Sequence, residues 1–112
     1  MKHEMKLHRE PFENIKSGIK TIELRLYDEK RRAISVGDEI EFVNADSERL
    51  LCKVVAVHIF DSFESLYRAL PLTKCGYTER DVHRASPDDM DLYYSKEKQK
   101  KWGAVGIELE LI

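Results

Sequence analysis

The chain has 112 residues, a net charge of −2, and 36% charged residues with both signs intermixed. A chain of this length has room for one hydrophobic core, and ten aromatic residues exclude a disordered protein. No apolar run reaches 18 residues and the N-terminus has no apolar segment, which excludes a membrane span and a secretory signal; we expect one cytoplasmic domain over residues 1–112.

The first half of the chain predicts three strands and one short helix. Pro11 is suited to the start of a helix and Gly18 to its end, with Phe12 and Ile15 on the side that faces the core. The strands are expected over about 5–9, 20–27 and 39–44, the last after a turn at Val36-Gly37-Asp38.

The second half predicts two strands and two or three helices. Residues 50–60 are apolar on both alternating faces, which favours a strand buried on both sides in a small barrel. We expect helices from an N-cap at Asp61 to Leu70, over 78–82, and from Ser86 to about Lys100. The last strand covers 104–112. The predicted core residues in these strands are Cys52, Val54, Val55, Val57, Ile59, Val105, Ile107, Leu109 and Leu111.

These elements predict an α+β fold in which a small mixed barrel of about five strands carries three or four peripheral helices. Two cysteines, Cys52 and Cys75, stand too far apart for a zinc motif, and the four histidines show no ligand spacing. We therefore expect a buried thiol at Cys52, no metal site and no cofactor.

Charge is distributed unevenly along the chain. Residues 1–32 carry nine Lys or Arg against six Asp or Glu, whereas residues 33–112 carry ten against fifteen. The cluster Lys30-Arg31-Arg32 is a candidate anion-facing patch. The second basic cluster, at 96–101, is interpreted as a solvated face with a Glu97–Lys101 pair.

The segment Gly18-Ile19-Lys20-Thr21-Ile22-Glu23-Leu24-Arg25 places three charges within six residues of extended chain. Strand alternation puts Glu23, Arg25 and Tyr27 on one face. Lys20 joins them only if the strand begins after it, or if its long stem bends round the edge. The alternative is an amphipathic strand whose charged face is solvated and paired with itself.

The pattern Gly18-x-Lys20-x-x-Glu23-x-Arg25 resembles the signature of the activating signal cointegrator homology (ASCH) family of small domains. The order of the predicted elements is similar over nearly the whole chain. The C-terminal segments 93–95 and 102–107 are similar to the end of compact bacterial and archaeal members. The resemblance implies a PUA-like β-barrel.

The resemblance also implies a cleft that holds RNA or a nucleotide-like ligand, lined by Lys20, Glu23 and Arg25. Lysine and arginine suit phosphate or a base edge, and a glutamate accepts hydrogen bonds from an exocyclic amine. Tyr27, Tyr93 and Tyr94, with Trp102, are candidates to stack on a base. The net charge disfavours long non-specific nucleic-acid binding, and the sequence shows no DNA-specific motif and identifies no protein partner.

A second hypothesis is hydrolysis of N4-acetylcytidine or of RNA, since some compact members of the family are amidohydrolases that remove an acetyl group from modified cytidine. Lys20 matches the catalytic lysine of the amidohydrolases, but Glu23 stands where they have threonine, and would act with Lys20 if this chain is a hydrolase. Their distant glutamate has no single equivalent here; the candidates are Glu79, Asp81, Asp88 and Asp89. A third hypothesis is a structural or protein-interaction domain in which the motif forms salt bridges only.

Overall fold

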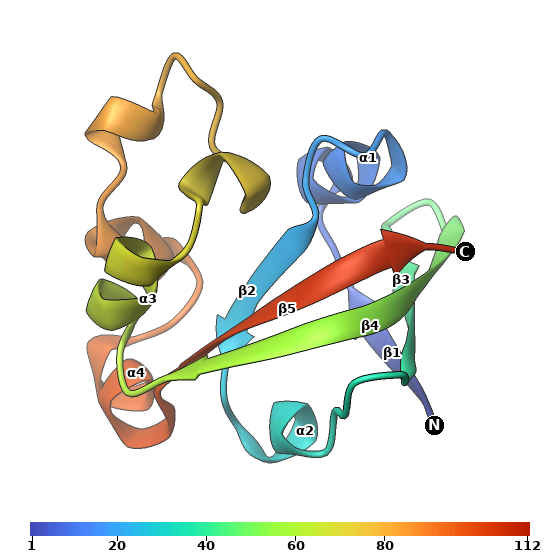
Figure 1. Ribbon diagram of the computed structural model, residues 1–112, viewed down its shortest axis with the longest axis horizontal. Coiled ribbons are helices and arrows are strands. Elements are labelled where there is room, and N and C mark those ends of the chain that lie inside the picture. The colour runs from blue at the N-terminus through green and yellow to red at the C-terminus, as the bar shows by residue number, and fades with distance from the viewer.

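The computed structural model describes residues 1–112 as a curled, half-closed sheet with helices on either side (Figure 1). The five strands lie in the order β1-β3-β4-β5-β2; β1 is parallel to β3, and the other neighbours are antiparallel. The expected α+β fold around a small mixed barrel of five strands is confirmed, and the structure shows the barrel as half-closed. In chain order the strands and α-helices are β1 (Lys2–Lys6), α1 (Arg9–Lys16), β2 (Ile22–Leu26), α2 (Glu29–Arg32), β3 (Glu39–Val43), β4 (Arg49–Phe60), α3 (Phe63–Ala69), α4 (Lys96–Trp102) and β5 (Ala104–Leu111).

Three short 3₁₀ helices complete the chain between α3 and α4: η1 (Leu72–Lys74), η2 (Val82–Arg84) and η3 (Pro87–Leu92). Together with α3 and α4 they form the layer on the left of Figure 1, while α1 lies on the other side of β2. None of the helices combines the length and the apolar character that crossing a bilayer requires.

The core has two parts that meet along β5 and β2. One part fills the curled sheet beneath α1, with Phe12, Phe42 and Ile107 fully buried. The other lies between β2 and the α3–η3 layer, where Leu24 packs with Phe63 and Leu66. The inward positions Val105, Ile107 and Leu109 of β5 are confirmed, whereas Leu111 at the end of the strand is exposed.

The two edges of the sheet, β1 and β2, are not paired with each other; one side chain of β2 and one of α2 reach the carbonyl oxygens of β1 instead. Arg25 Nη2 donates to the carbonyl oxygen of Lys6 at 2.8 Å, and Lys30 Nζ donates to that of Glu4 at 2.6 Å. Covering the carbonyls of an edge strand with cationic side chains prevents that edge from pairing with another chain. Lys30 thus has a structural contact here.

The other two members of the basic cluster are also held within the protein. Arg31 pairs with Asp28 at 3.1 Å, and Arg32 Nε donates to the carbonyl oxygen of Tyr27 at 2.9 Å. Each of the three cations thus makes a contact within the protein, while Lys30 and Arg32 stay exposed, and the anion-facing patch remains a prediction. The second basic cluster is exposed as expected, but Lys96 pairs with Asp88 and Asp91, and no Glu97–Lys101 pair forms.

The prediction that β4 is buried on both sides is wrong. Val55 is 38% exposed and Ile59 is 54% exposed, while Cys52 and Val54 are fully buried. The register with β5 shifts between Val54 and Ala56, so Val55 is the extra residue of a β-bulge. A bulge reverses the in-and-out alternation after it, and strict alternation therefore misplaces the residues beyond it.

The ends of several elements differ from their predicted positions. The first strand covers Lys2–Lys6, because its residues pair with 39–43 of β3, and helix α1 then starts at Arg9, with Pro11 in its first turn. Ser62, not Asp61, caps α3: its hydroxyl accepts from the backbone N–H of Ser65. The helix expected over 78–82 is instead the short turn η2, at Val82–Arg84.

The long helix expected from Ser86 to Lys100 is two helices. Ser86 is the N-cap as predicted and forms a capping box with Asp89, but η3 ends at Leu92. Tyr94 lies in the break, where its ring stacks on Phe63 with centroids 6.1 Å apart. Ser95 then caps a new helix, α4, through a hydrogen bond from the backbone N–H of Lys98. The break brings Tyr93 and Tyr94 to the cavity described next.

Candidate functional site

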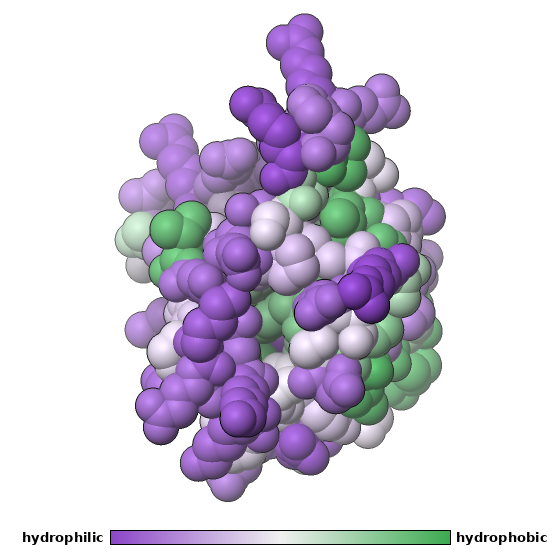
Figure 2. Space-filling model, turned by 90° about the vertical axis from the view of Figure 1, so that its left-hand side faces the viewer, coloured by the Kyte–Doolittle hydropathy of each residue, from purple (hydrophilic) through white to green (hydrophobic).

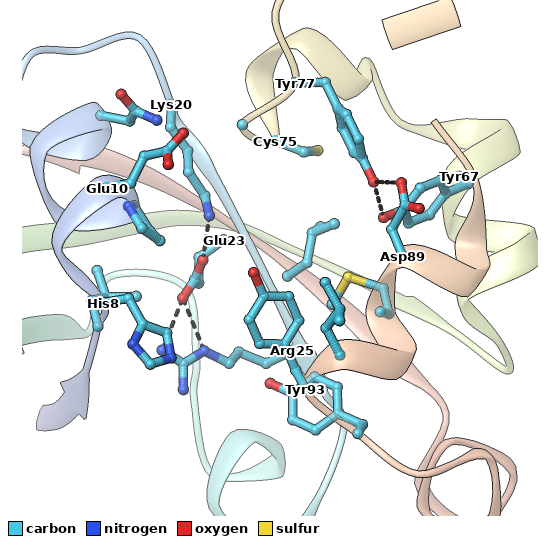
Figure 3. A pocket seen from close by; sticks show the side chains of 18 of the residues that line it. His8, Glu10, Lys20, Glu23, Arg25, Tyr67, Cys75, Tyr77, Asp89 and Tyr93 are labelled. Atoms are coloured by element: carbon cyan, nitrogen blue, oxygen red, sulfur yellow. Dashed lines mark hydrogen bonds and ion pairs between the residues drawn. The ribbon is translucent and has the colours of Figure 1, made fainter. Parts of the chain in front are cut away.

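A cavity of about 630 Å³ opens between the β1–α1 corner, strand β2 and the η1–η3 segment. Its volume is within the range of small-molecule sites in proteins. Figure 3 shows side chains from these elements converging on it. Strand β2 contributes Glu23, Leu24 and Arg25 to the lining. The residues of the β1–α1 corner are Lys6, Leu7, His8, Glu10 and Pro11, and those of the far side are Asp89, Met90, Leu92, Tyr93 and Tyr94.

Glu23 is the centre of the motif and accepts from both of its cations. Lys20 Nζ lies 2.7 Å from Glu23 Oε1, and Arg25 Nε donates to Glu23 Oε2 at 2.9 Å. Strand β2 begins at Ile22, so Lys20 precedes the strand and escapes its alternation. This is the condition under which the sequence places Lys20 with Glu23, and the three side chains do come together.

The three charged groups are almost removed from solvent. Glu23 is 3% exposed and Lys20 is 9% exposed. Burial raises the pKa of the Glu23 carboxyl, but the charges of Lys20 and Arg25 and their hydrogen bonds outweigh it, so the pKa lies below its usual value. Glu23 is therefore an anion at neutral pH, held between two cations.

The wall opposite Lys20 is a chain of three oxygen-bearing side chains (Figure 3). The hydroxyl groups of Tyr67 and Tyr77 are 2.7 Å apart, and Tyr77 Oη donates to Asp89 Oδ2 at 2.7 Å. The backbone N–H of Ser86 also donates to Asp89 Oδ2, at 3.2 Å, and this contact belongs to the capping box of η3. The start of η3 thus fixes the carboxylate at the cavity wall.

Aromatic rings surround the rest of the cavity. Tyr93 is 57% exposed, and its ring centroid lies 6.4 Å from that of His8, across the β1–α1 corner. Tyr94 lines the cavity from the same segment and is more enclosed. Exposed aromatic rings beside a cavity provide surfaces on which a planar ligand stacks.

The charges that line the cavity nearly cancel. Three cationic side chains (Lys6, Lys20 and Arg25) face four acidic ones (Glu10, Glu23, Asp81 and Asp89). Sites for long nucleic-acid backbones are instead strongly positive. The cavity therefore suits a ligand whose enclosed part is neutral or carries little charge.

The face of the molecule over α3 and α4 is mostly hydrophilic. Figure 2 shows this side largely covered by hydrophilic residues, with hydrophobic ones in smaller groups. The exposed lysines of α4 belong to this layer, and none of them lines the cavity. The cavity between β2 and the η1–η3 segment is therefore the candidate site.

Five of the six ligand-binding residues predicted from the sequence line this cavity, and Tyr27 does not. The Tyr27 ring packs against the barrel core, with the Arg32 guanidinium 4.5 Å from its centroid. Trp102 likewise packs on the helical part of the core, outside the cavity. Of the four candidate distant acids, Asp81 and Asp89 line the cavity, while Glu79 and Asp88 do not.

Sequence reasoning missed His8, Glu10, Tyr67 and Tyr77. Tyr67 is a buried residue of α3, but its hydroxyl joins the cavity wall. Tyr77 lies in an irregular segment with no periodic pattern. No local signal pairs it with Asp89, twelve residues later.

Both cysteines are free and buried. Cys75 lines the cavity near Lys20, but burial raises the pKa of its thiol to about 11, with a smaller opposing contribution from Lys20. Burial raises the pKa of Cys52 to about 11 as well. The nucleophilic form of cysteine is the thiolate, so neither side chain is activated for chemistry.

Comparison with known proteins agrees with the motif and with the fold. A family model described as "ASCH domain" matches residues 5–112. The chain belongs to the ASCH family. Lys20, Glu23 and Arg25 of this ASCH domain are the residues that carry the resemblance in the sequence.

Two solved structures are similar to this ASCH domain over its whole length. The crystal structure of hypothetical protein PH0355 is 36% identical in sequence, with a TM-score of 0.85 and complete coverage of both chains. The solution NMR structure of protein PF0455 from Pyrococcus furiosus is also 36% identical, with a TM-score of 0.76, and covers all of this chain and 98% of that one. Among curated proteins, none matches this ASCH domain.

Proposed function

We propose that this ASCH domain binds a nucleobase, carried by a nucleoside or by an unpaired nucleotide of RNA, in the cavity beside Lys20, Glu23 and Arg25. The observation that carries the proposal is the buried Lys20–Glu23–Arg25 cluster at the wall of an aromatic-lined cavity. Membership in a family that is generally RNA-binding-like supports it.

The donors and acceptors of the cavity suit a base edge. Lys20 has one hydrogen bond to Glu23 and keeps two N–H groups for a ligand, since an ammonium has three donors. Arg25 is more restricted: Nε and Nη2 are engaged by Glu23 and Lys6, which leaves Nη1. Because Glu23 fixes both cations, little side-chain entropy remains to be lost when a ligand binds.

The near-neutral lining favours a base over a run of phosphates. Binding that neutralises few phosphates releases few counterions, so its affinity changes little with salt concentration. We expect no more than one phosphate contact, made by Lys20 or Arg25 at the cavity wall. Affinity then comes mainly from stacking and hydrogen bonding.

The contacts of Lys20 favour binding over hydrolysis. A nucleophilic lysine needs a free lone pair, which burial or a neighbouring cation provides. Here Lys20 forms an ion pair with Glu23 at 2.7 Å, and an ammonium in that pair has no lone pair for attack. We therefore expect N4-acetylcytidine to be bound without efficient release of cytidine.

The test is a thermal-shift screen of nucleosides, nucleotides and short single-stranded RNAs, followed by titration calorimetry of those that stabilise the domain. Lys20→Met, which keeps most of the aliphatic stem, should weaken the affinity by about tenfold or more, as expected for a lost charge-assisted hydrogen bond. Lys98→Ala, on the exposed face of α4, should leave the affinity unchanged. The proposal fails if none of these compounds raises the melting temperature, or if Lys98→Ala weakens binding as much as Lys20→Met.

A further inference from the structure

The hydrogen bonds of Tyr67, Tyr77 and Asp89 run in one direction only. At neutral pH an aspartate carboxylate accepts hydrogen bonds and has no proton to donate. Tyr77 has a single hydroxyl proton, and it goes to Asp89 Oδ2. The 2.7 Å contact between the two tyrosine hydroxyls therefore needs the proton of Tyr67. The chain is directed from Tyr67 through Tyr77 to Asp89.

This direction leaves Tyr67, Tyr77 and Asp89 without a proton to donate to a ligand. Tyr67 Oη and Tyr77 Oη offer only lone pairs, and Asp89 Oδ1 receives no hydrogen bond from the protein. Burial raises the pKa of Tyr77, and the contact with Asp89 raises it further, so the phenol keeps its proton throughout the neutral range. The wall is thus an acceptor surface under ordinary conditions.

The opposite wall has the reverse character. Lys20 and Arg25 carry only N–H donors, and Glu23 between them is occupied by both. Figure 3 shows the Lys20–Glu23–Arg25 group and the Tyr67–Tyr77–Asp89 group on opposite sides of the same space. A ligand that spans the cavity therefore meets the donors of Lys20 and Arg25 at one end, with the Glu10 carboxylate beside them, and the acceptors of Tyr67, Tyr77 and Asp89 at the other.

We infer that the Tyr67–Tyr77–Asp89 chain makes the cavity selective for a planar ring that points an amino group at this wall. This inference rests on the proposed function and specifies its ligand. An oxo group in that place brings lone pairs against lone pairs and leaves both unpaired. A buried polar group without a partner costs about 1–3 kcal/mol, which corresponds to roughly a 5- to 150-fold difference in affinity between amino and oxo rings.

Two matched pairs of ligands test the inference: cytidine against uridine, and adenosine against inosine. Within each pair the size is nearly constant, while an exocyclic amino group is replaced by oxygen and the adjacent ring nitrogen gains a hydrogen. We expect calorimetry to show tighter binding of the amino member, by about tenfold or more, for at least one pair.

The decisive variant is Tyr77→Phe. This substitution removes the middle hydroxyl of the Tyr67–Tyr77–Asp89 hydrogen-bond chain. The hydroxyl proton of Tyr67 is then free to be donated to an oxo group of the ligand. The ratio of amino to oxo affinity should fall towards one. Asp89→Asn is the second variant, because its amide adds a donor and keeps an oxygen for the backbone N–H of Ser86, and it should lower the ratio too. Tyr27→Phe removes a hydroxyl outside the cavity and should keep the wild-type ratio.

The outcomes separate this inference from the proposed function. Equal affinity for the amino and oxo members of both pairs overturns the inference and leaves nucleobase binding intact. If none of the four nucleosides binds, both the inference and the proposed function are overturned for free nucleosides. If the folded Tyr77→Phe and Asp89→Asn proteins keep the wild-type ratio of amino to oxo affinity, the selectivity comes from another wall of the cavity. That result refutes the role given to the Tyr67–Tyr77–Asp89 hydrogen-bond chain.

Discussion

Removal of the negative charge at Glu23 tests whether the motif is a tightly coupled buried cluster. In Glu23→Gln, Lys20 and Arg25 keep their charges and lose their common carboxylate, although their side chains are only 10% and 14% exposed. Breaking a buried ion pair by removing one partner costs about 3–5 kcal/mol. For a domain of this size that cost lowers the melting temperature by roughly 12–20 °C, at about 4 °C per kcal/mol.

The same substitution should remove part of the acid sensitivity of the domain. Because the pKa of Glu23 is lowered in the folded protein, the unfolded chain binds the proton more tightly, and acid favours unfolding. The stabilisation is complete above the ordinary glutamate pKa of 4.5 and is lost as the pH falls through the lower, folded value. The difference in melting temperature between wild type and Glu23→Gln should therefore be largest near pH 7 and narrow below pH about 4.5.

Calorimetric melting from pH 3 to pH 7 measures both effects. Glu64→Gln is the matched control, because Glu64 forms an exposed i,i+4 pair with Arg68, and such pairs contribute about 1 kcal/mol or less. Adding Lys20→Met to Glu23→Gln should restore part of the stability, since one unpaired cation disappears. A Glu23→Gln protein that melts within a few degrees of wild type, or whose deficit does not change with pH, would refute this reasoning.

Two further predictions concern the core and the thiols. Val54→Asp should unfold the domain, because it places an unpaired charge at a fully buried position. Val55→Asp, at the exposed bulge, should give a folded protein with a cooperative thermal transition. Circular dichroism melts of the two variants distinguish these outcomes, and an unfolded Val55→Asp protein would contradict the bulge. Burial raises the pKa of Cys52 and of Cys75 to about 11. At pH 8 both thiols should therefore react slowly with a disulfide reagent in the native protein and at once in denaturant. Rapid reaction of the native protein would show that they are accessible thiolates.

The part of the site that one strand carries could be predicted from the sequence. Glu23 and Arg25 are two residues apart on β2, so strand alternation alone puts them on one face, and the start of the strand at Ile22 decides where Lys20 goes. The acceptor wall could not be predicted in this way. Tyr67, Tyr77 and Asp89 come from α3, an irregular loop and η3, and only tertiary packing brings their oxygens together.

The errors in the predicted fold have equally local causes. An apolar run such as 50–60 does not reveal which residue forms a bulge, and the single extra residue Val55 changes which later residues are exposed. In the segment 86–100 the predicted helix start at Ser86 is correct, but the helix ends at Leu92 and not near Lys100. The second cap at Ser95 and the stacking of Tyr94 on Phe63 break the helix there and turn the aromatic pair at 93–94 towards the cavity.

The most direct test of ligand binding in this cavity is an NMR titration of the ¹⁵N-labelled domain with adenosine or cytidine. Binding as described here predicts chemical-shift changes in the backbone amides of β2 around Glu23, of Gly76 and Tyr77, and of η3 around Asp89, with those of α4 unmoved. The Lys20→Met protein should show the same pattern only at higher ligand concentration. Shifts confined to the lysines of α4, or spread evenly over the surface, would contradict a site in the cavity.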